Sequence, residues 1–256
     1  RAYFFQNKDG RIIFAIPYER DFTLIGTTDQ EFSGDARGVR ISEEETTYLL
    51  AAASEYFARP VTNPDIVWSY AGVRPLFNDH KSKAQEATRD YVLTTEGDAA
   101  TGALVNVFGG KLTTHRRLSE EALDHIEKVL GKRGKPWTKG SKLPGGEFGP
   151  KEFDLQVERL NELYPNLADK FLRRLARQYG TRAATVLGTA KRMQDLGEAF
   201  GADLTQREVE YLIDNEWARS AEDVLWRRTK LGLRVGIGDR VRLEKWFETR
   251  KTGGKK

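Results

Sequence analysis

VNVFGGKLTT, residues 105–114, joins an apolar, strand-like run to a Gly109-Gly110 turn, Lys111 and the start of a helix. Glycine lets a ligand approach the backbone closely. The first N–H groups of a helix, at the positive end of its dipole, favour an anion or a polarised carbonyl group. Lys111 adds a mobile positive charge. The segment predicts either an anion-binding turn or a tight strand-to-helix connection without a ligand. It is not a Walker loop, because the GxxxxGK spacing is absent.

On either side of this segment, the first half of the chain alternates strand-like and helical patterns. Residues 7–10 read as a turn between two β-rich runs, which predicts a hairpin, and Pro17 is expected to end the second strand. Ser42 and Glu45 have the spacing of a capping box, so a helix should begin there. The expected strands cover 2–6, 11–16, 22–26, 65–74, 91–95 and 103–108, and a second helix is expected over 112–130.

The composition changes between residues 131 and 150, where glycine and proline recur, and this segment is expected to be a linker. Residues 151–256 are expected to form a separate, wholly helical domain. The stretch from Thr205 to Glu208 has the pattern of another capping box, and Ser220 is a plausible N-cap. The expected helices cover 153–163, 168–178, 182–192, 205–217, 221–228 and 238–250.

The composition also excludes several kinds of site. The chain contains no cysteine, which rules out disulfides, thiol nucleophiles, thiolate zinc sites and cysteine-ligated iron–sulfur clusters. His80, His115 and His125 lack metal-ligand spacing, so no metal site is expected. Residues 151–256 hold 22 Lys and Arg against 17 Asp and Glu. That surplus is modest and interleaved with acids, so no nucleic-acid partner is expected.

Two further segments place an arginine beside a β-rich run. Arg74 ends the run WSYAGVR, and Arg89 lies in ATRDY. A planar guanidinium group binds phosphate or carboxylate through two hydrogen bonds, so these two arginines could hold one phosphate. The alternatives are a solvated or structurally paired Arg74 and a surface pair of Arg89 with Asp90. The segment LIGTTD, residues 24–29, could line a pocket or simply form a turn.

Eight blocks follow one another along the chain: IPYERDFTLIGTTD (16–29), DIVWSYAGVRPL (65–76), ATRDYVL (87–93), VFGGKLTTHRRLSEEAL (107–123), WTKGSKLPGG (137–146), YGTRAATVL (179–187), DLGEAFG (195–201) and VEYLIDNEWARSAEDVLWRRTKLGL (209–233). Together, and in this order, they resemble one family: the bacterial FAD-dependent glycerol-3-phosphate dehydrogenases of the aerobic type. This family begins with a G-x-G-x-x-G turn that binds the FAD pyrophosphate, and the present sequence has no such motif. The chain also begins without an initiator Met. It therefore resembles the C-terminal portion only, and we expect this fragment alone to be inactive.

The resemblance implies a fold and a reaction. Residues 1–130 would be an α+β substrate-binding region together with the closing strand and helix of an FAD-binding domain. The linker 131–150 and an all-α C-terminal domain, 151–256, would follow. The parent enzyme would oxidise sn-glycerol 3-phosphate to dihydroxyacetone phosphate by hydride transfer to FAD and pass the electrons to a quinone.

The resemblance also assigns site residues. Arg74 and Lys111 match catalytic positions of the family, and Arg74, Arg89 and Lys111 match substrate-binding positions. The positions near FAD are Gly109, Gly110, Lys111, Leu112 and Thr113.

The family is cytoplasmic and peripheral on the inner face of the cell membrane, and this chain is expected to share that localisation. The fragment could also form a homodimer, because the missing part of its parent sheet leaves an exposed edge that promotes association. Two alternative functions remain open. One is a glycerol-3-phosphate oxidase that uses O2 in place of the quinone. The other is a noncatalytic module that docks a partner or a membrane surface through its basic C-terminal region.

Overall fold

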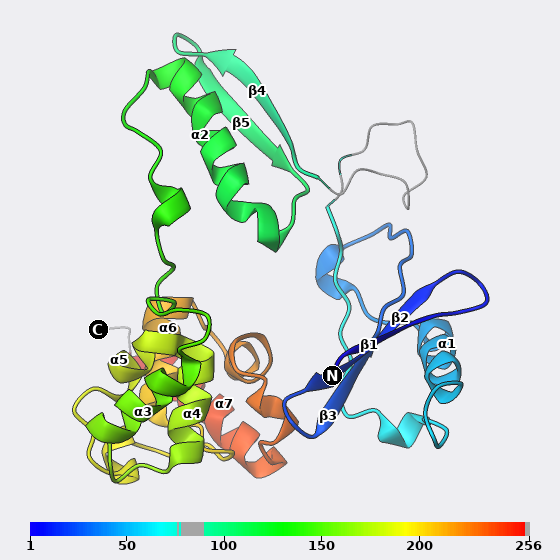
Figure 1. Cartoon of the computed structure of the whole chain (residues 1–256), viewed down its shortest axis with the longest axis vertical. Coiled ribbons are helices and arrows are strands. Elements are labelled where there is room, and N and C mark those ends of the chain that lie inside the picture. Colours follow the sequence, from blue (N-terminus) through cyan, green and yellow to red (C-terminus); the bar gives the residue numbers. More distant parts are fainter. Residues whose placement is uncertain (76, 78–89, 254–256) are drawn as a thin grey trace. The chain divides into compact units, whose positions relative to one another are not determined.

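A computed structural model describes residues 1–75, 77 and 90–253 of the chain (Figure 1). The chain divides into two compact units, an N-terminal unit of Arg1–Ser141 and a C-terminal unit of Lys142–Lys256. The division falls inside the Gly- and Pro-rich segment 131–150. The N-terminal unit contains strands and helices, whereas the C-terminal unit is built from helices, so an α+β region followed by a helical region is confirmed.

The N-terminal unit begins with an antiparallel sheet of three strands that pair in chain order. The side chains of β2 alternate, so that Ile13 and Ala15 are buried while Ile12, Phe14 and Ile16 are exposed. This two-residue period is typical of a strand with one face covered. The expected hairpin and third strand are confirmed. The strands are β1 (Tyr3–Gln6), β2 (Ile12–Tyr18) and β3 (Phe22–Gly26).

Pro17 does not end the second strand, because β2 continues to Tyr18 and Pro17 pairs with Thr23 of β3. The reason lies in the register: the pairing of β1 with β2 extends only to Ala15. Beyond that residue β2 has a strand neighbour on one side only, so the missing N–H of proline is tolerated there.

Helix α1 (Glu43–Ser54) begins at the expected capping box. Glu45 N–H donates to Ser42 Oγ at 3.1 Å, and Ser42 N–H donates to Glu45 Oε2 at 2.9 Å. Ala52 and Ala53 are the buried residues of the helix. Tyr56, just beyond the helix, stacks on Phe5 of β1 with ring centroids 4.1 Å apart.

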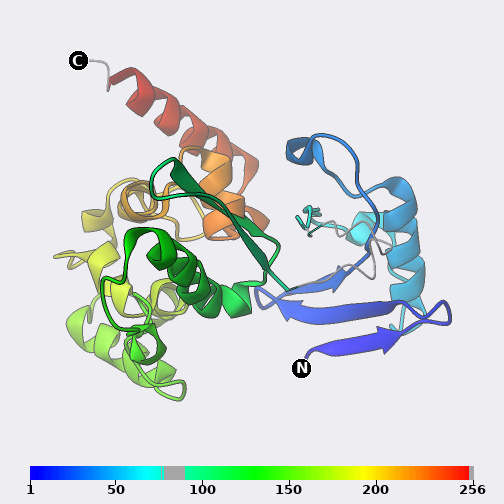
Figure 2. The same cartoon turned by 90° about the horizontal axis from the view of Figure 1, so that it is seen from above.

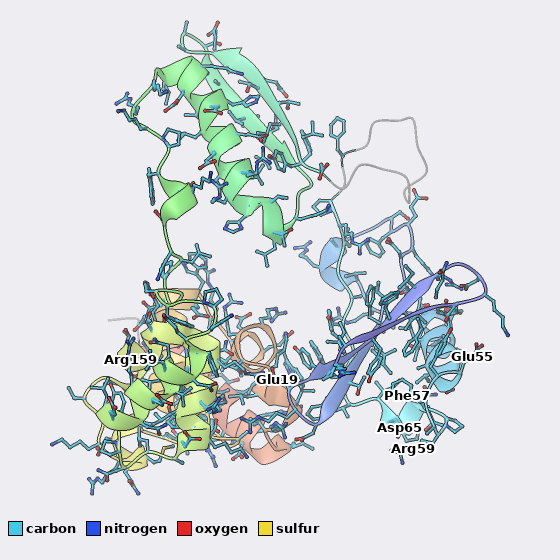
Figure 3. All side chains as sticks on the ribbon, in the orientation of Figure 1. Glu19, Glu55, Phe57, Arg59, Asp65 and Arg159 are labelled. Atoms are coloured by element: carbon cyan, nitrogen blue, oxygen red, sulfur yellow. The ribbon has the colours of Figure 1, made fainter. Side chains whose placement is uncertain are left out.

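The expected strand over 65–74 is not formed. Asp65 closes a short 3-10 turn (Asn63–Asp65) and accepts hydrogen bonds from Thr62, and the following residues, 66–74, have no regular structure (Figure 3). The segment is rich in β-branched and aromatic residues, but no strand among the described residues pairs with it. A strand needs a neighbour for its backbone hydrogen bonds, and composition alone does not provide one.

The second half of the N-terminal unit is a hairpin with a helix alongside it (Figure 1). The hairpin turn is held by Asp98, whose Oδ1 accepts from the N–H groups of Ala100 and Thr101 at 2.9 and 2.8 Å. A 3-10 turn, Leu112–Thr114, precedes the helix. The expected strands and the expected helix are confirmed. The elements are β4 (Val92–Asp98), β5 (Gly102–Phe108) and α2 (His115–Leu130).

The C-terminal unit consists of helices around one apolar core (Figure 2). The expected helix 182–192 is much shorter, because Gly188 takes a φ of +57° and closes α5 by donating to Ala184 O at 2.8 Å. The expected helix 221–228 is mostly a π-helix, Asp223–Arg228. The α-helices are α3 (Phe153–Leu163), α4 (Asp169–Tyr179), α5 (Ala183–Leu187), α6 (Gln206–Glu216) and α7 (Ile237–Gly253).

A buried ion pair lies in this helical core. Glu208 is fully buried and receives both Nη groups of Arg174, at 2.8 and 2.7 Å, and the Tyr179 hydroxyl at 2.7 Å. Asp203 lies 2.5 Å from Arg174 Nε. Burial alone would lower the pKa of Arg174, but the carboxylates of Glu208 and Asp203 raise it above its ordinary value. Burial, followed by the Glu208 charge, raises the pKa of Tyr179.

The expected capping box at Thr205 is only half formed as a result. Thr205 Oγ1 accepts from the N–H of Glu208 at 3.4 Å. The Glu208 side chain is held by Arg174 and Tyr179 in the core. The Ser220 cap is confirmed, since Ser220 Oγ accepts from the N–H of Asp223 at 3.1 Å.

Candidate functional site

Arg74 and the end of the segment LIGTTD meet in the structure. Arg74 Nη1 donates to Asp29 Oδ2 at 2.8 Å, although the two residues are 45 positions apart. Both side chains are half exposed, at 49% and 50%. The structural ion pair considered for Arg74 is therefore present. It uses one nitrogen of the guanidinium group, and the pair remains open to solvent.

The glycine turn lies against the backbone that follows Arg74. A Cβ added to Gly109 would lie 3.3 Å from the carbonyl oxygen of Asp90 and 3.7 Å from that of Pro75. Gly109 and Gly110 both take positive φ values, +71° and +100°, which side chains rarely adopt. The two glycines are thus required by the turn itself, which brings three segments together.

Lys111 lies beside the same backbone. Its Nζ is 3.9 Å from Asp90 Oδ1, a long ion pair between side chains that are 51% and 79% exposed. The Lys111 backbone is fixed more tightly, because its N–H donates to Thr114 Oγ1 at 3.3 Å and the Thr114 hydroxyl donates to Lys111 O at 3.0 Å. The ammonium group therefore stays accessible on a fixed backbone.

The start of α2 is electropositive. Acidic residues are usual in the first turn of a helix, where they complement the dipole, but α2 has none there. It begins with His115, Arg116 and Arg117, which follow Lys111 after the 3-10 turn Leu112–Thr114. Leu112, at 88%, is almost wholly exposed at this end of the helix. The arrangement can hold an anionic group, and it exposes an apolar side chain next to it.

Two side chains near this turn titrate differently from isolated groups. A hydrogen bond to Glu121 raises the pKa of Tyr91, the first residue before β4. A hydrogen bond from the Thr138 hydroxyl, reinforced by Arg116, lowers the pKa of Glu120. Nothing in the sequence marked Tyr91 or Glu120 as a neighbour of the glycine turn.

Arg89 lies outside the described residues, so its predicted role stays a prediction. Its neighbour Asp90 is described, and Asp90 lies against both Gly109 and Lys111. The structure therefore places the backbone next to Arg74 against the glycine turn that precedes Lys111, and it pairs each of these two cations with an aspartate. The two aspartates that pair with the predicted cations, Asp29 and Asp90, were not among the predicted site residues. Asp29 ends the segment LIGTTD and Asp90 follows Arg89, but no pattern in the sequence pairs Asp29 with Arg74 or Asp90 with Lys111.

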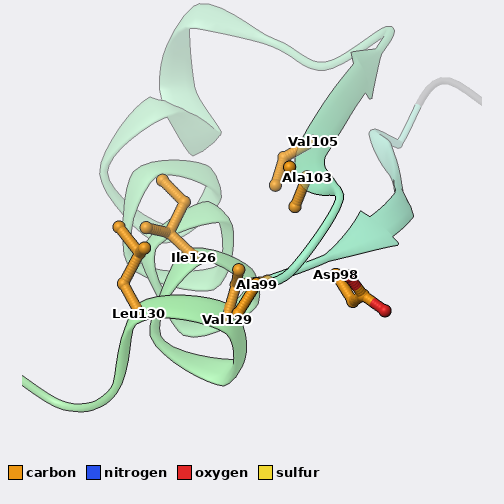
Figure 4. A pocket seen from close by; sticks show the side chains of 8 residues that line it. Asp98, Ala99, Ala103, Val105, Ile126, Val129 and Leu130 are labelled. Atoms are coloured by element: carbon orange, nitrogen blue, oxygen red, sulfur yellow. The ribbon is translucent and has the colours of Figure 1, made fainter.

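The hairpin and α2 also enclose an apolar pocket of about 160 Å³ (Figure 4). Ala103 and Val105 of β5 face Ile126, Val129 and Leu130 of α2 across it. It lies at the C-terminal end of α2, whereas Lys111 precedes the N-terminal end. A 16-residue helix is about 24 Å long, so this pocket is separate from the turn at Lys111.

In the described part of the chain, no three His, Asp or Glu side chains come together in a way that could hold a metal ion. Among those same residues, no helix is both long and apolar enough to span a membrane.

Comparison with known proteins finds similarity along most of the chain. Residues 1–116 match the FAD dependent oxidoreductase family, and residues 136–240 match the C-terminal domain of alpha-glycerophosphate oxidase. The aerobic glycerol-3-phosphate dehydrogenase of Escherichia coli K12 is 43% identical over 96% of this chain and 49% of its own length. The chain therefore resembles about half of an aerobic glycerol-3-phosphate dehydrogenase, and its first 116 residues match an FAD dependent oxidoreductase family.

Two further relatives show the range of this family. The glycerol-3-phosphate dehydrogenase of Pseudomonas aeruginosa PAO1 is 44% identical over 97% of the chain and 48% of that protein. The D-erythritol 1-phosphate dehydrogenase of Brucella abortus 2308 is 39% identical over 96% of the chain and 49% of that protein. The chain spans about half the length of each of these relatives.

The turn at Lys111 fits the family's FAD cofactor in its chemistry. An anionic or electron-rich ring edge would supply the negative charge that the first turn of α2 lacks. The exposed Leu112 side chain offers an apolar contact for a flat ring system, and the exposed Thr113 offers a hydroxyl group.

Proposed function

We propose that the protein containing this chain oxidises sn-glycerol 3-phosphate to dihydroxyacetone phosphate, using FAD. One observation carries the proposal: Arg74 and Lys111 come from separate blocks of the sequence, and the glycine turn joins the backbones that carry them. A substrate with a phosphate at one end and a secondary hydroxyl beside it needs two cationic groups a short distance apart. The names of the relatives support the substrate class.

Arg74 holds the phosphate in this proposal. Its Nη1 is occupied by Asp29, and the guanidinium group carries further N–H donors for a charge-assisted contact. The half-exposed side chain is accessible to a dissolved anion. Arg89 matches a second phosphate-binding position, and its contribution is inferred from the sequence resemblance alone.

Lys111 acts at the other end of the substrate. Its ammonium group donates a hydrogen bond to the C2 hydroxyl oxygen and holds it in place. It also stabilises the negative charge that develops on this oxygen as the hydroxyl proton passes to solvent and the C2 hydrogen leaves as hydride. FAD, when bound, supplies the hydride acceptor. Gly109, Gly110, Leu112 and Thr113 would hold its ring edge, and the helix dipole of α2 would favour negative charge there.

The same proposal assigns the domains and the partners. Residues 1–130 form the substrate-binding region and the closing strand and helix of the FAD-binding domain, 131–150 link them, and 151–256 form the helical domain. The electrons pass to a quinone, and the parent enzyme is cytoplasmic, associates with the inner membrane surface and forms a homodimer. The match of residues 136–240 to an oxidase domain makes O2 the alternative acceptor, which an oxygen electrode distinguishes directly.

A lysine substitution tests this proposal in the full-length protein. Lys111→Met should keep the FAD content and melting temperature but slow flavin reduction by glycerol 3-phosphate about 10²–10³-fold, the usual effect of removing an electrostatic partner. Lys128→Met, on the exposed surface of the same helix, is the matched control and should react at the wild-type rate. An unchanged rate for Lys111→Met would leave the turn as a purely structural connection. If D-erythritol 1-phosphate reduces the flavin faster than glycerol 3-phosphate does, then it is the substrate, and the proposed hydride transfer stays the same.

A further inference from the structure

Arg74 depends on a carboxylate that none of the predicted roles includes. We infer that Asp29 is a positioning residue that orients the Arg74 guanidinium group for the substrate phosphate. The inference rests on the proposed function, because it takes Arg74 as the phosphate ligand. It adds a second residue to that site and predicts that the two act as one unit.

Asp29 stands on a well-anchored part of the fold. It follows β3 by three residues, and the preceding Thr28 donates its hydroxyl to Glu45 Oε1 at 2.5 Å. Glu45 is itself fixed, because its other carboxylate oxygen accepts from Ser42 N–H in the capping box of α1. The carboxylate of Asp29 is therefore carried by a segment tied to both a sheet and a helix.

Arg74 stands on the opposite kind of backbone. Residues 66–74 form neither strand nor helix, and no other side-chain hydrogen bond or ion pair of Arg74 occurs within the described residues. A long side chain on irregular backbone samples many rotamers, and fixing it on substrate binding costs free energy of up to about 2 kcal/mol. The contact with Asp29 at 2.8 Å restricts these rotamers before the substrate arrives.

The geometry of the contact leaves room for a phosphate. Of the Arg74 nitrogens, Nη1 is the one that donates to Asp29. The guanidinium group is a rigid fork of five N–H donors. Fixing one nitrogen therefore fixes the direction of the others, and the edge that contains Nε and the second Nη can receive two phosphate oxygens.

Stability alone does not account for this pair. Both side chains are about half exposed, and exposed ion pairs contribute only about 0–1 kcal/mol to folding. Asp29 also places a negative charge near a site that is meant to bind an anion, which weakens long-range attraction. Orientation of Arg74 is the gain that offsets this repulsion.

The test is a double-mutant cycle in the full-length, FAD-loaded protein, with Asp29→Asn, Arg74→Ala and the double variant. Asp29→Asn should raise the KM for glycerol 3-phosphate about 10-fold, the lower end of the effect of losing a charge-assisted hydrogen bond. It should weaken inhibition by inorganic phosphate by the same factor, with unchanged kcat, FAD content and melting temperature. In the Arg74→Ala background the same substitution should change neither constant. Asp29→Glu, which keeps the charge, should recover part of the loss.

A matched control removes the charge from another exposed pair. Asp35 accepts from Arg37 at 2.7 Å, and Asp35→Asn should leave all constants at wild-type values. If Arg74→Ala raises KM but Asp29→Asn does not, or if the two effects add, the role of Asp29 is wrong and the proposed function stands. If Arg74→Ala itself leaves KM and phosphate inhibition unchanged, the proposed role of Arg74 fails, and the inference about Asp29 fails with it.

Discussion

Replacing Arg174 by methionine should destabilise the C-terminal unit severely, although the side chain keeps most of its apolar stem. Glu208 is fully buried and accepts two hydrogen bonds from Arg174 at 2.8 and 2.7 Å. Arg174→Met would leave this carboxylate with the Tyr179 hydroxyl as its remaining side-chain partner in the structure. Breaking a buried ion pair from one side costs about 3–5 kcal/mol.

That loss is large enough to measure by thermal unfolding. For a unit of this size a change of 1 kcal/mol shifts the melting temperature by about 4 °C, so a fall of roughly 12–20 °C is expected. Circular dichroism in the far ultraviolet follows the transition. Arg173→Met is the matched control, because Arg173 is the neighbouring residue and its pair with Asp154 is exposed. It should shift the melting temperature by less than about 4 °C, since exposed pairs contribute about 0–1 kcal/mol.

A second variant separates the lost pair from lost packing. Arg174→Met combined with Glu208→Gln removes the orphaned charge, and it should recover part of the stability that Arg174→Met alone loses. The reasoning is refuted if Arg174→Met melts within a few degrees of the wild type. It is also refuted if adding Glu208→Gln lowers the stability of Arg174→Met by as much as it lowers the stability of the wild type.

The remaining predictions concern pH, autonomy and the cofactor. Burial and Glu208 raise the pKa of Tyr179 above its ordinary value of 10.0. Above pH 10 the unfolded tyrosine therefore loses its proton while the folded one keeps it. Because of this group, the free energy of unfolding should then fall by about 1.4 kcal/mol per pH unit. In urea titrations, Tyr179→Phe should not show this part of the fall. Residues 142–256 alone should give a helical spectrum and a cooperative melt, because the apolar core from Val157 to Phe247 lies wholly within them; a gradual transition would mean that the unit needs the rest of the chain. The 256-residue chain alone should bind FAD weakly or not at all, since it lacks the G-x-G-x-x-G turn, and a purified yellow sample with stoichiometric FAD would overturn this.

Local patterns in the sequence predicted the elements whose partners are close along the chain. The β1–β2 hairpin, the Ser42 capping box and α3 formed as expected, because a turn, a cap or a helical period depends on a few neighbouring residues. Helix α2 also formed, with a 3-10 turn at its start.

Three of the wrong predictions share a cause, which is a partner distant in the sequence. Glu208 has the spacing of a capping residue, but Arg174, 34 positions earlier, binds its carboxylate in the core. Pro17 has the signal of a strand end, but β2 continues through it because β1 no longer pairs with β2 at that position. The composition of residues 65–74 indicates a strand, but the described residues provide no strand to pair with it.

The candidate site shows the same division. The glycine turn and Lys111 could be found from their spacing, because strand, turn and helix follow one another directly. The contact of Arg74 with Asp29 spans 45 positions, and no local pattern predicts which of the many acidic residues an arginine will meet. Asp29 and Asp90 could therefore be recognised as neighbours of the predicted cations only in the folded chain.

The most direct measurement is anaerobic reduction of the flavin in the full-length protein by sn-glycerol 3-phosphate. We expect rapid loss of the visible flavin absorbance and formation of one dihydroxyacetone phosphate for each FAD. Glycerol, which lacks the phosphate that Arg74 is proposed to hold, should reduce the flavin far more slowly. Two results would contradict the account: glycerol 3-phosphate leaves the flavin oxidised, or glycerol reduces it equally fast. In either case the substrate is not a polyol phosphate that the protein recognises by its phosphate.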